Sequence, residues 1–196
     1  MAVVVCVGCL DDESGTPVRG NGKGITITYY ALQEWNENPD RTIISNYHLF
    51  NVPFTYMTAQ EIYNAFQKGE LPEGSILLLD EISKFLNSLG MKQKTLTGFV
   101  NGFISQIRKL DADFYGASQR WMDVPKRFRA QTDRVLIPIK IHEDNQVCLL
   151  DRCKKHHFIE VYSHKPYREH PLVTLDTSII GKYYDTKEVI YDELSC

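Results

Sequence analysis

Hydrophobic residues along this chain alternate between short apolar runs and apolar stripes with the spacing of a helix. The runs predict buried strands at 3–9, 42–45, 75–80 and 113–118. The stripes predict helices that start at Ile25, after the capping box that opens at Thr58, and near Phe99. Because strands and helices take turns along the chain, we expect an α/β fold with a mainly parallel central sheet flanked by helices.

The last third of the chain has a different pattern. Three strand-like runs follow one another without an intervening helix, at 135–142, 147–150 and 158–163. The polar segment 143–146 predicts a turn that joins the first two runs as a hairpin, and 172–191 alternates weakly, as extended segments do. We therefore expect a core over 1–134 and a β-rich extension over 135–196 that completes the same domain.

Composition is that of an ordinary globular protein. Hydrophobic residues make up 43% and charged residues 24%, which excludes a disordered or collagen-like chain. No apolar run approaches the roughly 18 residues that a membrane span needs, and the apolar segment 2–10 lacks the basic flank of a signal peptide. Five cysteines, an odd number, favour a soluble protein in a reducing, intracellular setting. The net charge of −3 does not by itself indicate a nucleic-acid-binding protein.

A glycine-rich segment lies between the first strand and the first helix. Glycines let backbone N–H groups turn toward an anion, and the helix N-terminus adds a favourable dipole. A lysine at this corner reaches the β- and γ-phosphates of a nucleotide. The residues expected to contact the nucleotide are Gly20, Asn21, Gly22, Lys23, Gly24, Ile25 and Thr26.

This segment departs from the standard pattern G-x-x-x-x-G-K-[ST] at two positions. Pro17 stands where the first glycine is usual, and Gly24 stands where a hydroxyl residue usually contacts Mg²⁺. Thr26 is the nearest hydroxyl beyond it, and so the best candidate for that contact. The alternative interpretation is a glycine-rich surface turn with an incidental lysine.

The predicted strand at 75–80 ends in two adjacent carboxylates, Asp80 and Glu81. In nucleotide hydrolases the first carboxylate of such a pair holds Mg²⁺, often through water, and the second polarises the attacking water. A strand that ends at a solvated acidic turn is the alternative. The combination with the glycine-rich segment favours a nucleotide site.

The strand at 113–118 is followed by Gln119, and basic residues lie on both sides of it. A glutamine there can contact both the γ-phosphate and the attacking water, and so sense the nucleotide. Arg108, Arg127 and Arg129 are candidates for an arginine finger, because a planar guanidinium matches a phosphate. The alternatives are a cation at a helix C-terminus for Arg108 and a solvated face for the other two.

Cysteine and histidine residues raise the question of a zinc site, which needs four converging ligands. The residues of this kind are Cys6 and Cys9 near the start and Cys148, Cys153, His156 and His157 far downstream. Cys6 and Cys9 fall on opposite faces of the predicted strand, so buried free cysteines are favoured over zinc. A basic stretch at 152–170 suits either nucleic-acid phosphates or a solvated hairpin.

Taken in order, these motifs resemble the zonula-occludens-toxin-like ATPases, which belong with the FtsK/HerA class of DNA-pumping and virus-assembly motors. The motifs are the GKG loop at 22–24, ISNYHL at 44–49, LLLDE at 77–81, QIRK at 106–109, the strand that ends in Gln119, DVPKRFRAQTD at 123–133 and an echo of a tail motif at 180–188. The resemblance implies an additional-strand P-loop ATPase that forms a ring, with nucleotide bound between subunits.

Carried over by position, the resemblance assigns phosphate binding to Lys23, Mg²⁺ to Asp80 and the attacking water to Glu81. It makes Gln119 the sensor and Arg108 the first candidate for a finger that acts in trans, with Arg127 and Arg129 as rivals. It implies ATP and Mg²⁺ as cofactors, and double-stranded DNA and capsid or virion-vertex proteins as partners. The absence of an apolar span favours the viral genome-packaging ATPases of this group, in the host cytoplasm or on the virion.

Three other functions stay open from the sequence alone. The first is a motor of the same fold that extrudes a filament and does not package DNA. The second is a nucleotide-binding scaffolding module with little turnover, which Gly24 favours. The third is a nucleoside monophosphate kinase, which also carries a GKG loop but would need an arginine-rich lid that we do not find.

Overall fold

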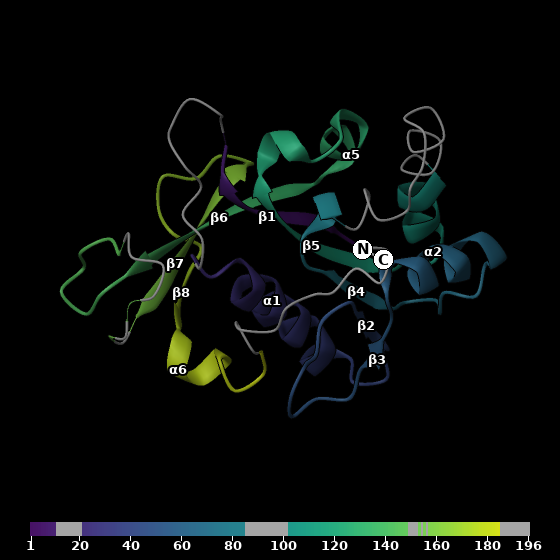
Figure 1. Cartoon of the computed structure of the whole chain (residues 1–196), viewed down its shortest axis with the longest axis horizontal. Coiled ribbons are helices and arrows are strands. Elements are labelled where there is room, and N and C mark those ends of the chain that lie inside the picture. The colour runs from purple at the N-terminus through teal and green to yellow at the C-terminus, as the bar shows by residue number, and fades with distance from the viewer. Residues whose placement is uncertain (11–20, 85–101, 149–152, 154, 156, 185–196) are drawn as a thin grey trace, which may run out of the picture.

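The computed structural model describes residues 1–10, 21–84, 102–148, 153, 155 and 157–184 (Figure 1). Its centre is a single sheet with the strand order β3-β2-β4-β5-β1-β6-β7-β8. The strands are β1 Val3–Cys9, β2 Ile43–Ser45, β3 Thr55–Tyr56, β4 Ile76–Leu79, β5 Asp113–Arg120, β6 Arg134–Ile141, β7 Phe158–Lys165 and β8 Val173–Asp176. All neighbouring pairs from β3 to β6 in this order are parallel. The last two pairs, β6 with β7 and β7 with β8, are antiparallel.

Helices cover both faces of this sheet (Figure 1). They are α1 Lys23–Glu37, α2 Ala59–Lys68, α5 Lys126–Gln131 and α6 Thr177–Ile180, with a 3₁₀ turn η1 Trp121–Asp123 and further helical residues at 82–84 and 102–109. The predicted capping box at Thr58 and the left-handed C-cap at Gly69 are both present on α2. The predicted α/β fold with its mainly parallel sheet is thereby confirmed.

Strand alternation divides the core into two layers. Val3, Val5 and Val7 point to the face covered by α2, α5 and the helix at 102–109. Val4 and Cys6 point to the opposite face, which is covered by α1. All five side chains are 2% exposed or less, because β1 lies between β5 and β6 and is covered on both faces.

The C-terminal third differs from the sequence expectation in two places. In its described part, the expected strand at 147–150 contributes only an isolated bridge, from Val147 to Ile141. The main partner of β6 is β7, because seven of its eight residues pair with β6 along almost its whole length. The expected extended segment at 172–191 holds β8 and then α6, whose first turn is capped by the Asp176 side chain.

Parallel pairing places the carboxyl ends of β1, β4 and β5 at one edge of the sheet. In open α/β sheets, ligands bind at that edge. Lys23 and Asp80 follow β1 and β4 along the chain, and Gln119 is the second-last residue of β5, so the topology brings the predicted site together. Along the described part of the chain, no helix combines the length and the apolar character that crossing a membrane requires.

Candidate active site

Four polar side chains form one hydrogen-bonded row at this edge. The ammonium of Lys23 donates to Asn21 Oδ1 at 3.2 Å and to Gln119 Oε1 at 3.1 Å. Gln119 in turn donates from Nε2 to Glu81 Oε1 at 2.5 Å. The structure thus brings together Lys23, Gln119 and Glu81, which come from three separate segments of the sequence.

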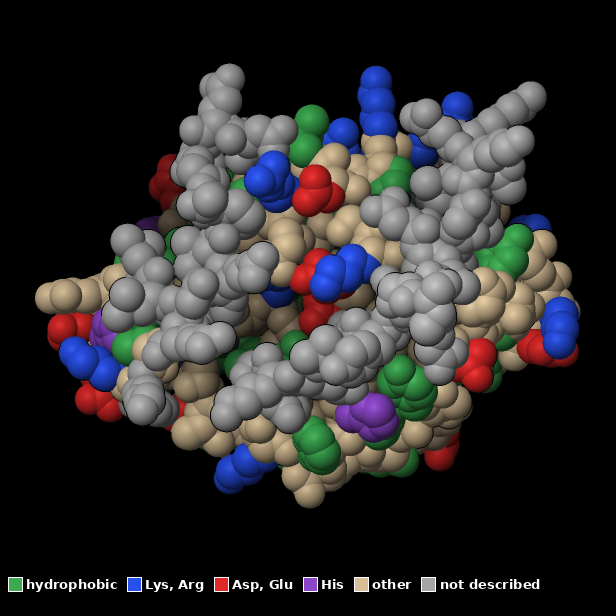
Figure 2. Space-filling view, viewed as in Figure 1, with side chains coloured by type: hydrophobic (Ala, Val, Ile, Leu, Met, Phe, Trp, Pro, Cys, Tyr) green, Lys and Arg blue, Asp and Glu red, His purple; other side chains and the backbone are tan. Residues whose placement is uncertain are grey.

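Charged side chains of both signs gather near the middle of the face shown in Figure 2. Lys23 itself is only 7% exposed. Among the described residues it forms no ion pair, and its two hydrogen-bond acceptors are neutral amide oxygens. A buried ammonium is stable only when an anion or several dipoles compensate its charge. Since an ammonium has three donors and two are engaged here, the third is available to an anionic ligand.

The start of α1 is built to receive the same anion. Its N-cap is Gly22, with φ +95°, and no side chain caps the helix. A Cβ at Gly22 would also collide with Ile159 of β7, so only glycine fits this turn. The first turn carries no acidic residue, and the positive end of a helix dipole favours an anion at such a turn.

Asp80 and Asn46 lock the ends of β4 and β2 together. The Asn46 side chain donates to the Asp80 carbonyl at 3.0 Å and accepts from the Asp80 N–H at 2.8 Å. Glu81, the next residue, has φ +52°, a left-handed conformation that strains a non-glycine residue by about 1–3 kcal/mol. The Asn46 clamp therefore holds Glu81 in a conformation that turns its carboxylate toward Gln119.

The electrostatic environment of Asp80 is unusual for a carboxylate. Removal from water raises its pKa, and the neighbouring Glu81 carboxylate raises it further. The Glu81 N–H, the Lys23 charge and the Tyr184 hydroxyl act in the opposite direction. Burial thus disfavours the charged form of Asp80 in the folded protein, and carboxyl groups perturbed in this way cluster at functional sites.

Tyr184 fills the space beside Gly24. Its hydroxyl lies 3.2 Å from Asp80 Oδ2, and its ring packs edge-on against Tyr47 with 5.1 Å between centroids. A Cβ at Gly24 would lie 2.5 Å from the Tyr184 hydroxyl oxygen and would overlap the ring. The tyrosine thus explains why glycine stands where Ser or Thr is usual, and it places a hydroxyl against Asp80 from a distant segment.

Other predicted site residues have well-defined places. Thr26 is fully buried, and its hydroxyl donates to the Gly22 carbonyl at 2.9 Å, so its contact with Mg²⁺ stays a prediction. Ile25 belongs to α1, and its side chain packs in the core layer between this helix and the sheet. Gly20 lies outside the described residues. The thiol of Cys6, beneath this site, has its pKa raised to about 12 by burial, so it is a protonated packing residue.

The three candidate arginines lie apart from the row of polar side chains. Arg108 forms an ion pair with Asp133 at 3.7 Å. Arg129 lies 5.8 Å from the centroid of the Trp121 ring and donates to Met122 Sδ. Arg127 is exposed on α5. Within the described part of this chain, none of them contacts Lys23 or Glu81, so a role as a finger requires a second subunit.

Sequence reasoning missed two residues that shape the site. Asn46 ends an apolar strand, and a polar residue at the end of a predicted parallel strand is the signal that could have found it. Tyr184 lies in the tail motif at 180–188, to which sequence reasoning gave no role in the site. It reaches the site because Leu49 bridges to it and the Phe50 N–H bonds to the Tyr183 carbonyl.

A parallel sheet with a lysine-bearing glycine turn and an acidic strand end defines the P-loop NTPase fold. The structure is similar to the N-terminal domain of zonular occludens toxin from Neisseria meningitidis, with a TM-score of 0.52 and 14% identity over 94% of this chain and 92% of that chain. It is also similar to two structures of the genome packaging NTPase B204 from Sulfolobus turreted icosahedral virus 2, each over 86% of this chain and 98% of that chain. The complex with AMPPCP gives a TM-score of 0.48 and 15% identity, and the complex with sulfate gives a TM-score of 0.49 and 16% identity. No model of a protein family and no curated protein matches the sequence. At these identities the toxin domain supports the fold alone, and function has to be argued from the residues.

The packing of Tyr184 on Gly24 leads to a double-mutant prediction. We expect Gly24→Ser to destabilise the protein by about 1–3 kcal/mol, because the added atoms overpack against the ring. In a Tyr184→Ala background the same substitution should change stability by less than about 0.5 kcal/mol. Denaturant unfolding of the four proteins measures the coupling. Equal losses in both backgrounds would contradict the proposed contact.

The raised pKa of Asp80 predicts a pH-dependent effect of Asp80→Asn. Because the pKa of Asp80 is raised in the folded state, ionisation of this carboxyl destabilises the fold, so the isosteric amide should leave the melting temperature at pH 7 unchanged or higher. As pH falls from the folded pKa toward the lower pKa of the unfolded chain, the wild-type carboxyl is protonated in the folded state and the penalty shrinks. The difference between the two melting temperatures should therefore shrink toward pH 4. A variant that is less stable at pH 7, with a gap independent of pH, would show that the charge is not penalised.

Proposed function

We propose that this protein hydrolyses ATP with the side chains of the Lys23 row. The observation that carries the proposal is the buried Lys23 ammonium, which binds two neutral amide oxygens and forms no ion pair among the described residues. The phosphates of a nucleoside triphosphate would supply an anion that pairs with this ammonium. These phosphates would lie at the N-terminus of α1, over Gly22 and Gly24, where the N–H groups of the first turn and the helix dipole favour negative charge.

The donor set beside Lys23 fits Mg²⁺, which prefers hard oxygen ligands. Asp80 would hold the ion directly or through water, and Tyr184 would supply the hydroxyl that Gly24 lacks. When bound, Mg²⁺ neutralises charge on the β- and γ-phosphate oxygens. The tyrosine hydroxyl already fixes one oxygen of Asp80, so it orients this carboxylate before the nucleotide arrives.

Glu81 and Gln119 perform the water chemistry. The Glu81 carboxylate orients a water for attack on the γ-phosphorus and accepts its proton, while the bond from the γ-phosphorus to the bridging oxygen breaks and ADP leaves. The Gln119 amide accepts a hydrogen bond from Lys23 and donates one to Glu81. If nucleotide binding moves Lys23, the planar Gln119 amide transmits that movement to the Glu81 carboxylate. This is the role expected of a residue that senses bound nucleotide.

Completion of the site by a neighbouring chain follows from the positions of the arginines. Arg108, Arg127 and Arg129 do not reach this chain's own row among the described residues, and an arginine added in trans stabilises the charge of the transition state. The proposed assembly is therefore a ring with shared sites. The ordered sequence motifs support a motor that translocates double-stranded DNA, as in viral genome packaging, where capsid or vertex proteins would be its partners. Extrusion of a filament is the second candidate, which the resemblance of the same motifs to the zonula-occludens-toxin-like ATPases leaves open.

The direct test is ATP hydrolysis over a series of protein concentrations, with and without double-stranded DNA. Shared sites predict that turnover per chain rises with concentration, and a DNA motor predicts stimulation by DNA. Lys23→Ala should abolish turnover and nucleotide binding. Glu81→Gln should retain binding and lower kcat by at least about 100-fold, because only the proton acceptor is lost.

Two substitutions on α2 and just after it serve as matched controls. Lys68 and Glu70 are exposed and form an ion pair with each other at 3.9 Å, and among the described residues neither contacts the Lys23 row, so Lys68→Ala and Glu70→Gln should hydrolyse ATP as the wild type does. Full turnover by Glu81→Gln would refute its role. Nucleotide binding without turnover at any concentration would replace the motor with a binding module, and turnover that DNA does not change would favour the filament function.

A further inference from the structure

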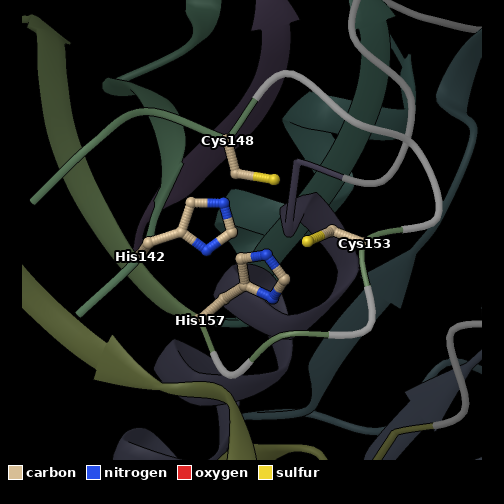
Figure 3. Close-up of side chains that lie close together, drawn as sticks. All are labelled: His142, Cys148, Cys153 and His157. Carbon is tan, nitrogen blue, oxygen red and sulfur yellow. The ribbon is translucent and has the colours of Figure 1, made fainter. Parts of the chain in front are cut away.

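Four side chains outside the active site converge in the C-terminal part of the sheet. They are His142, Cys148, Cys153 and His157, and one ligand atom from each lies within 4.8 Å of the other three. Figure 3 shows the two imidazole rings and the two thiols directed toward a common space. The ring centroids of His142 and His157 are 4.7 Å apart. We call these four residues the Cys₂His₂ cluster.

The β6–β7 ladder places the two histidines. Its last antiparallel pair is Ile141 with Phe158. His142 follows the first of these residues and His157 precedes the second, so the register sets them opposite each other. The His157 carbonyl accepts a hydrogen bond from the Thr177 hydroxyl at 2.7 Å, which fixes the backbone of this residue.

A tight turn brings the first cysteine back to His142. The His142 N–H bonds to the Gln146 carbonyl at 2.9 Å, and the Cys148 N–H bonds to the Lys140 carbonyl at 2.8 Å. Asn145, with φ +60°, takes the left-handed position that this return requires. The turn expected at 143–146 therefore has a specific consequence, because it sets a thiol beside an imidazole.

The cluster is sheltered from water. Cys148 and His157 are 4% and 7% exposed, and His142 and Cys153 are half-buried. The Nδ1 atom of His142 is buried and has no hydrogen-bond partner among the described residues. A buried ring nitrogen that lacks a hydrogen bond costs free energy, about 1–3 kcal/mol. Coordination of a metal ion would remove this penalty.

We propose that the Cys₂His₂ cluster is a structural zinc site. Two thiolates and two neutral imidazoles form a tetrahedral ligand set, and the two negative charges of the thiolates balance those of Zn²⁺, so the sheltered site has no net charge. Bond lengths of about 2.3 Å to sulfur and 2.0–2.1 Å to nitrogen put tetrahedral ligand atoms about 3.3–3.8 Å apart. The observed atoms need to approach by only about 1 Å to reach that spacing, and each zinc ion that binds displaces two thiol protons.

Cys6 and Cys9, the two cysteines that made zinc unfavourable from the sequence, do not belong to this cluster. The ligands have the spacing H-x₅-C-x₄-C-x₃-H along 142–157, so one continuous segment provides all four. The site therefore clips the long connection between β6 and β7 at its base. Ile159, two residues beyond His157, is the side chain that packs against Gly22 at the nucleotide turn, so the zinc clip also steadies one wall of the active site.

The test is the metal content of the full chain, purified under a thiol reductant and measured by elemental analysis. We expect one zinc ion per chain, and a tetrahedral thiolate spectrum when Co²⁺ replaces zinc. A strong chelator should lower the melting temperature by at least about 5 °C, and added zinc should restore it. Neither readout involves nucleotide, so this proposal and the proposed ATPase function can fail separately.

Matched substitutions locate the ligands. Cys153→Ser and His142→Asn should lose zinc, whereas Cys9→Ser and His164→Asn, which lie outside the cluster, should keep one ion per chain. Because Cys153 and His142 are half-buried, these variants are expected to fold, and their Co²⁺ spectra provide a second measure. Wild-type protein without zinc that also fails to bind Co²⁺, or a disulfide between Cys148 and Cys153 in that protein, would overturn the proposal.

Discussion

The burial of the Lys23 ammonium is the constraint on which the rest of this structure depends. The lysine sits at the first position of α1, donates hydrogen bonds to the amide oxygens of Asn21 and Gln119, and favours the charged form of the nearby Asp80 carboxyl, with which it forms no ion pair among the described residues. Keeping it there requires a turn that only Gly22 can make and a strand end that presents Gln119. The interactions around Glu81 and Asp80 extend the same arrangement toward the water and the metal ion that phosphate chemistry needs.

The C-terminal third of the chain takes part in this arrangement and is more than an appendage. β7 supplies Ile159, which packs on Gly22, and the segment after α6 supplies Tyr184, which packs on Gly24. Gly22 and Gly24 are thus each matched to a side chain more than a hundred positions away. The Cys₂His₂ cluster lies at the base of the same ladder, so one element carries both a proposed metal clip and a wall of the active site.

Local sequence patterns predicted what depends on local physics. The parallel sheet, the capping box at Thr58 and the convergence of Lys23, Glu81 and Gln119 follow from strand runs, cap chemistry and the rule that parallel strands end at one edge. The role of Tyr184 could not be predicted, because it rests on a contact with Gly24 that only the folded chain creates. The Cys₂His₂ cluster was missed for a related reason: His142 looked like the end of a strand, and the register of β6 with β7 made it a partner of His157.

The central claim is that Lys23 is held at a cost until an anionic nucleotide compensates it. The most direct measurement is the melting temperature of the wild type and of Lys23→Met, each with and without Mg²⁺ and ATP. The account predicts that Lys23→Met alone is at least as stable as the wild type, because the buried charge is gone, and that only the wild type gains stability from the nucleotide. A variant that is less stable without nucleotide and still stabilised by ATP would contradict it.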